Sequence, residues 1–232
     1  MITFIVPARG GSQRLKNKNI KDLNGKPLIF YTIESLLNHR LISRVLFTSD
    51  SENYCDLVEK EFGKQVSLEL RPAETATNTT KVVDEVERLL LSRSEYFETE
   101  WFGMALPTAP LRDHKIVEEA LKFFQKNPHP FFSCNIYDFP VQFAFRKSEK
   151  KKQNWSPVLE DSPMITGNTR SQDIEKLYRP NGALYINSKQ NFLASKILYK
   201  NANAFEISPE ASLDVDTELD FRLVEQIIKS KL

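Results

Sequence analysis

The N-terminal stretch MITFIVPARGGSQRLKNKN (residues 1–19) joins a short apolar run to a loop that is rich in glycine and basic side chains. The run predicts a buried strand over residues 1–7, because it is continuous and too short for a signal peptide or a membrane span. Gly10 and Gly11 follow this strand and belong to only seven glycines in the chain, which indicates backbone that approaches something closely. In an open parallel sheet, ligands bind beyond the carboxyl ends of the strands, where this loop would lie.

The chain beyond this loop alternates between strand-like and helix-like patterns. Such alternation through short connections is typical of a parallel sheet that helices cover on both faces. We therefore predict an α/β fold with a doubly wound, mostly parallel sheet. The expected strands cover residues 44–47, 66–70 and 101–106, and the expected helices cover residues 26–39, 51–62, 82–90 and 114–127.

The pattern changes after about residue 128, although strands and a final helix return. Residues 155–167 have no regular pattern and carry apolar side chains that we expect to be exposed. An arm packed on a partner subunit would explain this mixture. We predict one domain over residues 1–232 with an inserted hairpin or arm at about residues 138–172 for dimerisation. The later strands are expected over residues 131–137, 142–146, 183–186 and 204–207, and the final helix over residues 217–231, capped by Thr217 and Asp220.

The composition excludes several classes of protein. The chain has 32 Lys and Arg against 31 Asp and Glu, so its net charge of +1 argues against a nucleic-acid binder driven by bulk charge. Cys55 and Cys134 lie far apart in apolar surroundings, which suits core positions in a reducing compartment and neither a disulfide framework nor a zinc site. The three histidines lack metal-ligand spacing. We expect a soluble cytoplasmic protein without a membrane segment.

The loop after the first strand has the composition of a phosphate site. Its paired glycines and serine can present backbone N–H groups to a phosphate, and its basic side chains supply positive charge. The spacing matches neither G-x-G-x-x-G nor G-x-x-x-x-G-K-[ST], so the dinucleotide and P-loop motifs are not indicated. The alternative is a basic loop that is merely solvated. The basic residues concerned are Arg9, Arg14, Lys16 and Lys18.

Two further clusters follow expected strands. Arg71 precedes a proline and is followed by threonines and an amide at residues 77–80, a combination that suits a nucleobase edge or a ribose. The alternative is a set of helix caps. Residues 106–112 contain two prolines and an arginine, and this rigid loop is either a structural turn or part of a site.

A pair of carboxylates forms the fourth cluster. If residues 213–215 are extended, Asp214 and Asp216 point to the same side, because side chains alternate along a strand. Their repulsion then needs a cation, and a hard Mg²⁺ ion shared with substrate phosphates fits. Acid enrichment at a helix N-terminus is the alternative, but it explains Asp214 poorly. Taken together, the clusters predict a nucleotidyltransferase that uses a nucleoside triphosphate and Mg²⁺.

The ordered motifs resemble those of the CMP-sialic acid synthetases, or N-acylneuraminate cytidylyltransferases, including the legionaminic and pseudaminic acid cytidylyltransferases. The resemblance covers nearly the whole chain and implies a nucleotide-diphospho-sugar transferase-like fold. The matching stretches are RGGSQRLKNKN (9–19), GKPLI (25–29), TSDS (48–51), RPAETATNT (71–79), ALPTAPLR (105–112), RSQD (170–173), NGALYI (181–186) and DVDTELD (214–220).

The resemblance implies that CTP and a nine-carbon nonulosonic acid give the CMP-sugar and pyrophosphate, through in-line attack of the sugar 2-hydroxyl on the α-phosphorus. It implies a homodimer whose arm completes the partner's sugar pocket, with no nucleic acid or membrane partner. The catalytic residues would be Arg9, Lys18, Asp214 and Asp216, the last two also holding Mg²⁺. The nucleotide-binding residues would be Arg9, Gly10, Gly11, Ser12, Lys18, Asn19, Arg71, Thr79, Thr80 and Lys81. The sugar-binding residues would be Leu106, Thr108, Arg170, Gln172 and Asn181, with Arg170 as the carboxylate clamp.

Several positions depart from the family pattern. Leu106 replaces a glutamine near the sugar, and leucine cannot hydrogen-bond a hydroxyl or N-acyl group, so a different and more apolar sugar is one hypothesis. Transfer to a Kdo-type acid or a sugar phosphate, and a catalytically silent nucleotide-binding protein, stay open as alternatives. A dehydrogenase is least supported, because the expected acidic residue and third glycine are missing. The other departures are Gln13, Lys16, Asn78 and Lys81.

Overall fold

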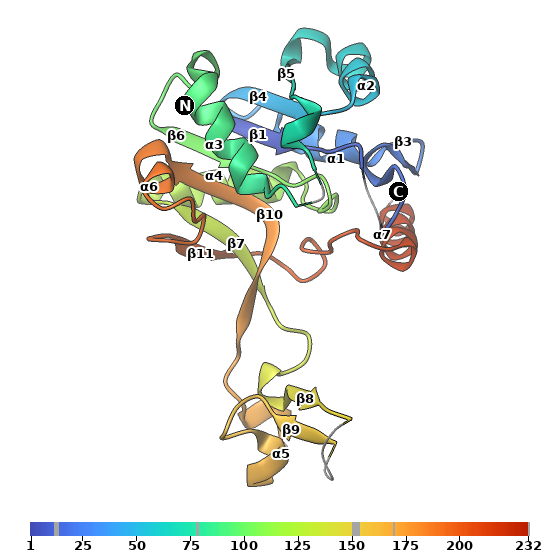
Figure 1. The fold of residues 1–232 in the computed structure, drawn as a ribbon, viewed down its shortest axis with the longest axis vertical. Coiled ribbons are helices and arrows are strands. Elements are labelled where there is room, and N and C mark those ends of the chain that lie inside the picture. Colours follow the sequence, from blue (N-terminus) through green and yellow to red (C-terminus); the bar gives the residue numbers. More distant parts are fainter. Residues whose placement is uncertain (12–13, 78, 150–153, 169, 232) are drawn as a thin grey trace. The chain divides into compact units, whose positions relative to one another are not determined.

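The computed structural model describes residues 1–11, 14–77, 79–149, 154–168 and 170–231 (Figure 1). The chain divides into two compact units. The first unit consists of Met1–Cys134 and Pro180–Leu232, and the second consists of Asn135–Arg179. The predicted arm at residues 138–172 falls inside the second unit.

Within the described residues, seven strands form one sheet in the order β11-β7-β10-β6-β1-β4-β5. Strand β1 lies between β4 and β6 and is parallel to both, and β5 is parallel to β4. Strand β10 is antiparallel to β6, so the sheet is mixed but mostly parallel, as predicted. The strands are β1 (Ile2–Pro7), β4 (Ile42–Ser49), β5 (Val66–Leu70), β6 (Trp101–Met104), β7 (Phe131–Ile136), β10 (Tyr178–Ser188) and β11 (Asn203–Glu206).

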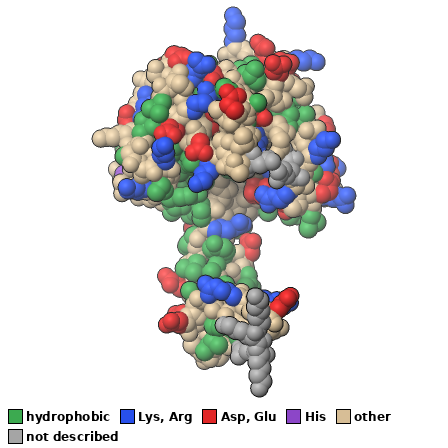
Figure 2. All heavy atoms as spheres, in the orientation of Figure 1, with side chains coloured by type: hydrophobic (Ala, Val, Ile, Leu, Met, Phe, Trp, Pro, Cys, Tyr) green, Lys and Arg blue, Asp and Glu red, His purple; other side chains and the backbone are tan. Residues whose placement is uncertain are grey.

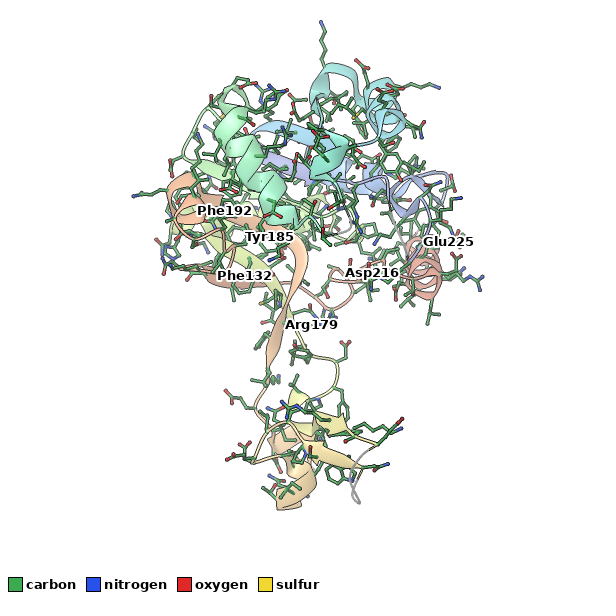
Figure 3. The ribbon with its side chains drawn as sticks, in the orientation of Figure 1. Phe132, Arg179, Tyr185, Phe192, Asp216 and Glu225 are labelled. Carbon is green, nitrogen blue, oxygen red and sulfur yellow. The ribbon has the colours of Figure 1, made fainter. Side chains whose placement is uncertain are left out.

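Helices cover both faces of the sheet. The buried side chains of α1, α2 and α4 form one core cluster with Phe4 and Val6 of β1, whereas α3 and α6 pack with Ile5 on the opposite face. Tyr185 of β10 and Phe192 of α6 belong to that second cluster (Figure 3). This double cover explains why β1 is continuously apolar instead of alternating. The helices are α1 (Leu28–Leu36), α2 (Glu52–Phe62), α3 (Val82–Ser92), α4 (His114–Lys126) and α6 (Lys189–Leu193).

The C-terminal helix α7 (Glu218–Ser230) packs on the N-terminal loop region. A hairpin of β2 (Asp22–Leu23) and β3 (Lys26–Pro27) turns through Asn24 and Gly25, whose φ angles of 52° and 88° are both left-handed, as a type I′ turn requires. Phe221 and Val224 of α7 pack in one cluster with Leu23. Thr217 and Asp220 form the capping box that the sequence predicts. This packing places residues 213–217, which precede α7, beside the loop after β1.

The second unit contains a short antiparallel pair, β8 (Phe145–Lys147) and β9 (Trp155–Pro157), and a one-turn helix, α5 (Pro163–Thr166). The expected strand over residues 142–146 is correct only at its end. Val141–Phe143 forms a 3₁₀ turn instead, in which the Phe143 N–H donates to the Pro140 carbonyl at 3.1 Å. Hydrophobic side chains gather on the visible face of this unit (Figure 2). Its exposed apolar residues include Phe139, Phe145, Val158, Leu159 and Ile165.

Two predictions made from composition can be compared with the structure. Cys55 and Cys134 are free and buried, as expected for core positions. In the part of the chain that the structure describes, every helix is too short or too polar to cross a bilayer.

Candidate functional site

Two adjoining cavities open at the carboxyl ends of β1 and β6. The first has a volume of about 440 Å³ and the second about 280 Å³. Pro7, Arg9 and Leu106 line both, so the two cavities lie side by side. All of their lining residues belong to the first unit. The cavities therefore lie at the edge of the sheet where the sequence predicts a ligand site.

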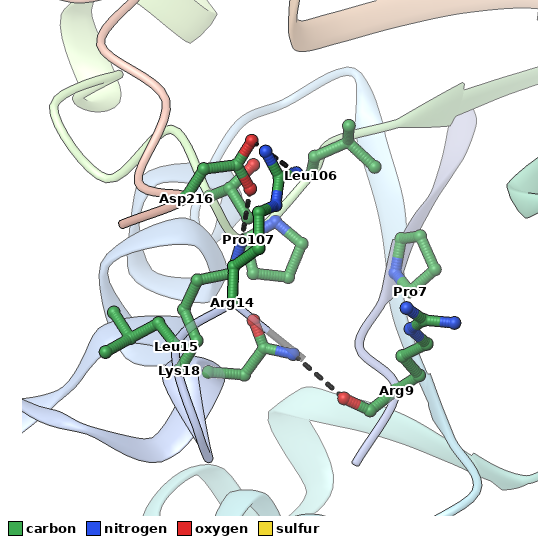
Figure 4. A pocket seen from close by; sticks show the side chains of 10 residues that line it. Pro7, Arg9, Arg14, Leu15, Lys18, Leu106, Pro107 and Asp216 are labelled. Carbon is green, nitrogen blue, oxygen red and sulfur yellow. Dashed lines mark hydrogen bonds and ion pairs between the residues drawn. The ribbon is translucent and has the colours of Figure 1, made fainter. Parts of the chain in front are cut away.

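The first cavity contains a carboxylate between two cations (Figure 4). An Asp216 oxygen lies 2.8 Å from Nζ of Lys18, and its other oxygen lies 2.7 Å from a guanidinium nitrogen of Arg14. The Lys18 side chain is only 12% exposed, whereas that of Arg14 is 69% exposed. The structure thus brings together Lys18 and Asp216, two residues of the predicted site. Arg14 joins them, although the sequence identifies it only as one of the basic residues of the loop.

Asp214 lies beside this pair. Residues 213–216 form no regular element, but the Val215 N–H donates to the Thr108 carbonyl at 2.7 Å and the Val215 side chain is fully buried. The surrounding protein atoms raise the pKa of Asp214 by desolvation, although the residue keeps exposed surface. A hydrogen bond from Thr108 opposes that rise, and repulsion from Asp216 adds to it. The cavity is lined by Asp216 and not by Asp214.

The two carboxylates of Asp214 and Asp216 fit a divalent cation only if a bound substrate supplies further oxygen ligands. Desolvation, and to a smaller degree repulsion from Asp216, raises the pKa of Asp214, and a bound cation would favour its charged form. Within the described ranges, no three His, Cys, Asp or Glu side chains come together as a metal site. Mg²⁺ is commonly held by one or two carboxylates together with substrate phosphates. Asp214 and Asp216 could act in this way.

The loop after β1 is tied to its neighbours by side chains. Asn19 is buried and donates through Nδ2 to the Arg9 carbonyl at 3.1 Å (Figure 4). Arg9 in turn donates to the Thr77 carbonyl at 3.1 Å, which places its side chain at the border of both cavities. Gly11 is exposed and lines neither cavity. Ser12, Gln13 and Asn78 lie outside the described residues.

The second cavity is lined by the cluster predicted to bind a nucleobase. The Arg71 side chain is 6% exposed, and its Nε has no hydrogen-bond partner among the described residues. Thr80 and Lys81 line the same cavity. Thr79 does not line it, and its hydroxyl pairs instead with that of Thr77 at 3.1 Å. A buried guanidinium with an unused donor suits a ligand that brings an acceptor.

Sequence reasoning missed Asp50. Its Oδ1 accepts the Gly10 N–H at 2.9 Å and lies 3.7 Å from Nη2 of Arg71, so one carboxylate touches both loops. The Gly10 amide, predicted to face a phosphate, is therefore engaged within the protein. The signal was present in the sequence, because Asp50 directly follows β4, which is parallel to β1 and ends beside it. Polar residues at the ends of adjacent parallel strands meet at one edge.

Leu106 lies where the two cavities join, and its position depends on Gly182. Gly182 has a φ of 76°, and a Cβ added there would stand 2.9 Å from Cδ1 of Leu106. Next to it, Oδ1 of Asn181 accepts from the Ser133 hydroxyl at 2.6 Å. Asn181 therefore adjoins in sequence the glycine that packs against Leu106. Arg170 and Gln172 belong to the second unit.

The loop of residues 106–112 serves structure and site together. Leu106 and Thr108 line the first cavity, but Arg112 at its other end is fully buried. Arg112 donates to the Ala183 carbonyl at 2.6 Å and to the Ser35 hydroxyl at 3.3 Å, and burial lowers its pKa to about 9. Arg112 thus has the structural role that one alternative gave this loop, whereas the site role of Leu106 and Thr108 stays a prediction.

Solved structures share this fold. The structure of CMP:2-keto-3-deoxy-manno-octonic acid synthetase complexed with CTP matches with a TM-score of 0.70 over 100% of both chains, at 16% sequence identity. A likeness at that identity identifies the class of fold, and it confirms the predicted mostly parallel α/β architecture.

Sequence comparisons place the chain in a family. A profile of the cytidylyltransferase family matches residues 3–228. The pseudaminic acid cytidylyltransferase of Campylobacter jejuni is 30% identical over 228 residues, covering 97% of this chain and 95% of that protein. The chain belongs to the cytidylyltransferase family, as its motifs predict.

A second relative is longer than this chain. The N-acylneuraminate cytidylyltransferase of Escherichia coli O18:K1:H7 is 32% identical over 237 residues, which cover 99% of this chain and 52% of that protein. An N-acylneuraminate cytidylyltransferase of Streptococcus agalactiae is covered to 51%. The chain thus spans about half the length of these two relatives.

Proposed function

We propose that the protein is a cytidylyltransferase that joins CTP to a nonulosonic acid, giving the CMP-sugar and pyrophosphate. The observation that carries the proposal is that Arg9, Lys18 and Asp216 line one cavity, which adjoins the cavity that Arg71 lines. Cations for a polyphosphate and a buried donor for a base are thereby adjacent. The names of the relatives supply the substrate class.

The residues of the two cavities suggest their roles in the reaction. The triphosphate would lie against Arg9 and Lys18, and the cytosine beside Arg71 with the backbone of residues 79–81. The sugar 2-hydroxyl would attack the α-phosphorus in line, and pyrophosphate would leave. Arg9 and Lys18 would neutralise the charge that grows on the leaving group, and losing one such donor typically costs on the order of 10²–10³ in rate.

We assign Asp214 and Asp216 to a Mg²⁺ site. When bound, the ion would supply charge neutralisation and a template for the phosphate oxygens. The two carboxylates would hold it together with the nucleotide, because Mg²⁺ is commonly held by one or two carboxylates and substrate phosphates.

The sugar is proposed to be apolar where it meets Leu106. Leucine offers no hydrogen bond at the junction of the cavities, which favours a deoxygenated acid of the legionaminic or pseudaminic type over N-acetylneuraminate. Arg170 would clamp the sugar carboxylate, with Gln172 beside it. A Kdo-type acid is the alternative substrate, and nucleotide binding without turnover is the alternative function.

We further propose a homodimer in the cytoplasm. The exposed apolar side chains of the second unit suit contact with a second copy of the chain, whose arm would complete the sugar pocket. Free, buried cysteines suit a reducing compartment.

Pyrophosphate release tests the function directly. The protein would be assayed with CTP and Mg²⁺ against N-acetylneuraminate, legionaminate, pseudaminate and Kdo. Release with one nonulosonate, lost in Asp214→Ala and retained in the exposed control Asp56→Ala, is the expected result. Release with Kdo alone would favour the alternative substrate, and CTP binding without release would favour the silent homologue. If the protein does not bind CTP, the proposal is wrong.

A further inference from the structure

Asp216 is held by two cations of very different mobility. Lys18 lies on a 3₁₀ turn and is largely buried, so its ammonium is fixed beside the carboxylate. Arg14 reaches the other oxygen of Asp216 at 2.7 Å from a side chain that is 69% exposed. An exposed arginine can leave this contact at small cost, because such ion pairs contribute only about 0.2–1 kcal/mol. A buried lysine cannot.

The same carboxylate is a proposed ligand of the metal. A carboxylate that is paired with two cations is a poorer ligand for a third, because the cations repel one another. Arg14 also lines the first cavity, where the triphosphate is proposed to bind. A guanidinium binds phosphate oxygens through two parallel hydrogen bonds and is well suited to exchange a carboxylate for a phosphate.

We propose that Arg14 is a removable counter-ion of Asp216 that couples nucleotide binding to metal binding. Without nucleotide, Arg14 neutralises Asp216 and weakens the site for a divalent cation. When a triphosphate enters, Arg14 transfers to its oxygens, and the Asp216 oxygen that Arg14 held becomes free for the ion, while Lys18 keeps the other oxygen. This inference rests on the proposed function and adds a binding residue to it.

Binding of Mn²⁺ to the nucleotide-free protein tests the inference without any assay of turnover. Free Mn²⁺ is counted from its electron paramagnetic resonance signal during a titration. Arg14→Gln should tighten Mn²⁺ binding roughly two- to fivefold, as expected for loss of an exposed ion pair. The same variant should weaken CTP binding in EDTA roughly tenfold or more, because a charge-assisted contact is lost. A misfolded variant would weaken both, so the opposite directions identify the effect.

Arg222→Gln is the matched control. Arg222 is 73% exposed and pairs with Glu218 at 3.6 Å on α7, and it lines neither cavity. We expect it to leave both affinities unchanged. In an Asp216→Asn background, Arg14→Gln should no longer improve Mn²⁺ binding. The inference is overturned if CTP binds but Arg14→Gln leaves Mn²⁺ binding unchanged or weaker. If the wild-type protein binds no CTP, the proposed function falls as well.

Discussion

The carboxylate of Asp50 accepts a hydrogen bond from the backbone N–H of Gly10 at 2.9 Å, across 40 positions of sequence. The same oxygen lies 3.7 Å from the guanidinium of Arg71, whose side chain is almost fully buried. The end of β4 therefore fixes the loop after β1 and orients the cation of the second cavity. One carboxylate thus contacts both the loop beside the first cavity and the arginine that lines the second.

Replacing Asp50 should weaken nucleotide binding. Asp50→Asn removes the charge that faces Arg71 and weakens the acceptor for Gly10, and hydrogen bonds to charged groups contribute about 1.5–3 kcal/mol. We expect the CTP dissociation constant, measured by calorimetry, to rise about tenfold or more. Asp56→Asn, an exposed carboxylate on α2, is the control. A change of less than twofold in Asp50→Asn would refute the supporting role.

A largely buried charge network of Glu69, Glu85 and Arg88 should contribute strongly to stability. Arg88 contacts Glu85 at 2.8 Å and Glu69 at 3.0 Å, and Glu85 also accepts the Thr48 hydroxyl at 2.6 Å. Arg88→Met leaves the fully buried Glu85 without its cation, and breaking a buried pair costs about 3–5 kcal/mol. Urea unfolding should show that loss. Lys122→Met, which breaks the exposed pair with Glu118, should change stability by less than about 1 kcal/mol.

Leu106 should set the preference among sugar acids. Leu106→Gln introduces an amide where the two cavities join, so we expect kcat/KM to shift toward N-acetylneuraminate and away from more apolar nonulosonates, by roughly ten- to a hundredfold in ratio. Competition between two acids in one pyrophosphate-release assay measures that ratio. An unchanged ratio would show that Leu106 does not contact the sugar.

Cys55 should be inert in the folded protein. Burial, aided by nearby acids such as Asp56 and Asp50, raises the pKa of its thiol to about 11, so almost no reactive thiolate is present at pH 8. A colorimetric thiol reagent should label it slowly without denaturant and rapidly in guanidinium chloride. Cys134, whose pKa is also raised by burial, should behave alike. Rapid labelling of the native protein would contradict the buried placement.

His39, whose ring stacks on that of His114, should make stability fall with acid. Their ring centroids are 3.7 Å apart, and the pKa of His39 is lowered, first by burial and further by His114, despite a hydrogen bond to the Ser35 carbonyl. The unfolded state therefore binds this proton first, so the contribution is complete above about pH 6.5 and declines as the pH drops toward the lowered pKa. His39→Gln should lose less stability than wild type between pH 7.5 and 5.5. His129→Gln should lose as much stability as wild type over the same range. If His39→Gln loses as much as well, His39 is not the cause.

Local patterns predicted most of the elements for identifiable reasons. The short, continuously apolar run of residues 2–7 favoured a buried strand, and the strand–helix alternation that follows is typical of a covered parallel sheet. The error at residues 142–146 arose because three residues after Pro140 satisfy their backbone groups in a tight turn, which an apolar pattern does not reveal. The antiparallel direction of β10 was also invisible, because strand direction depends on how the intervening chain returns.

The sequence by itself determined the strand, the basic loop and the ordered family motifs, because periodicity, glycine content and residue chemistry are properties of short segments. Only the tertiary structure decided which charges meet. Lys18 and Asp216 are 198 positions apart and touch because Val215 and Phe221 pack in the same cluster as Leu15 and Leu23. The exposed Arg14 and the supporting Asp50 likewise gained their partners from packing. Contacts of this range are set by how apolar surfaces are buried together, and no local pattern encodes them.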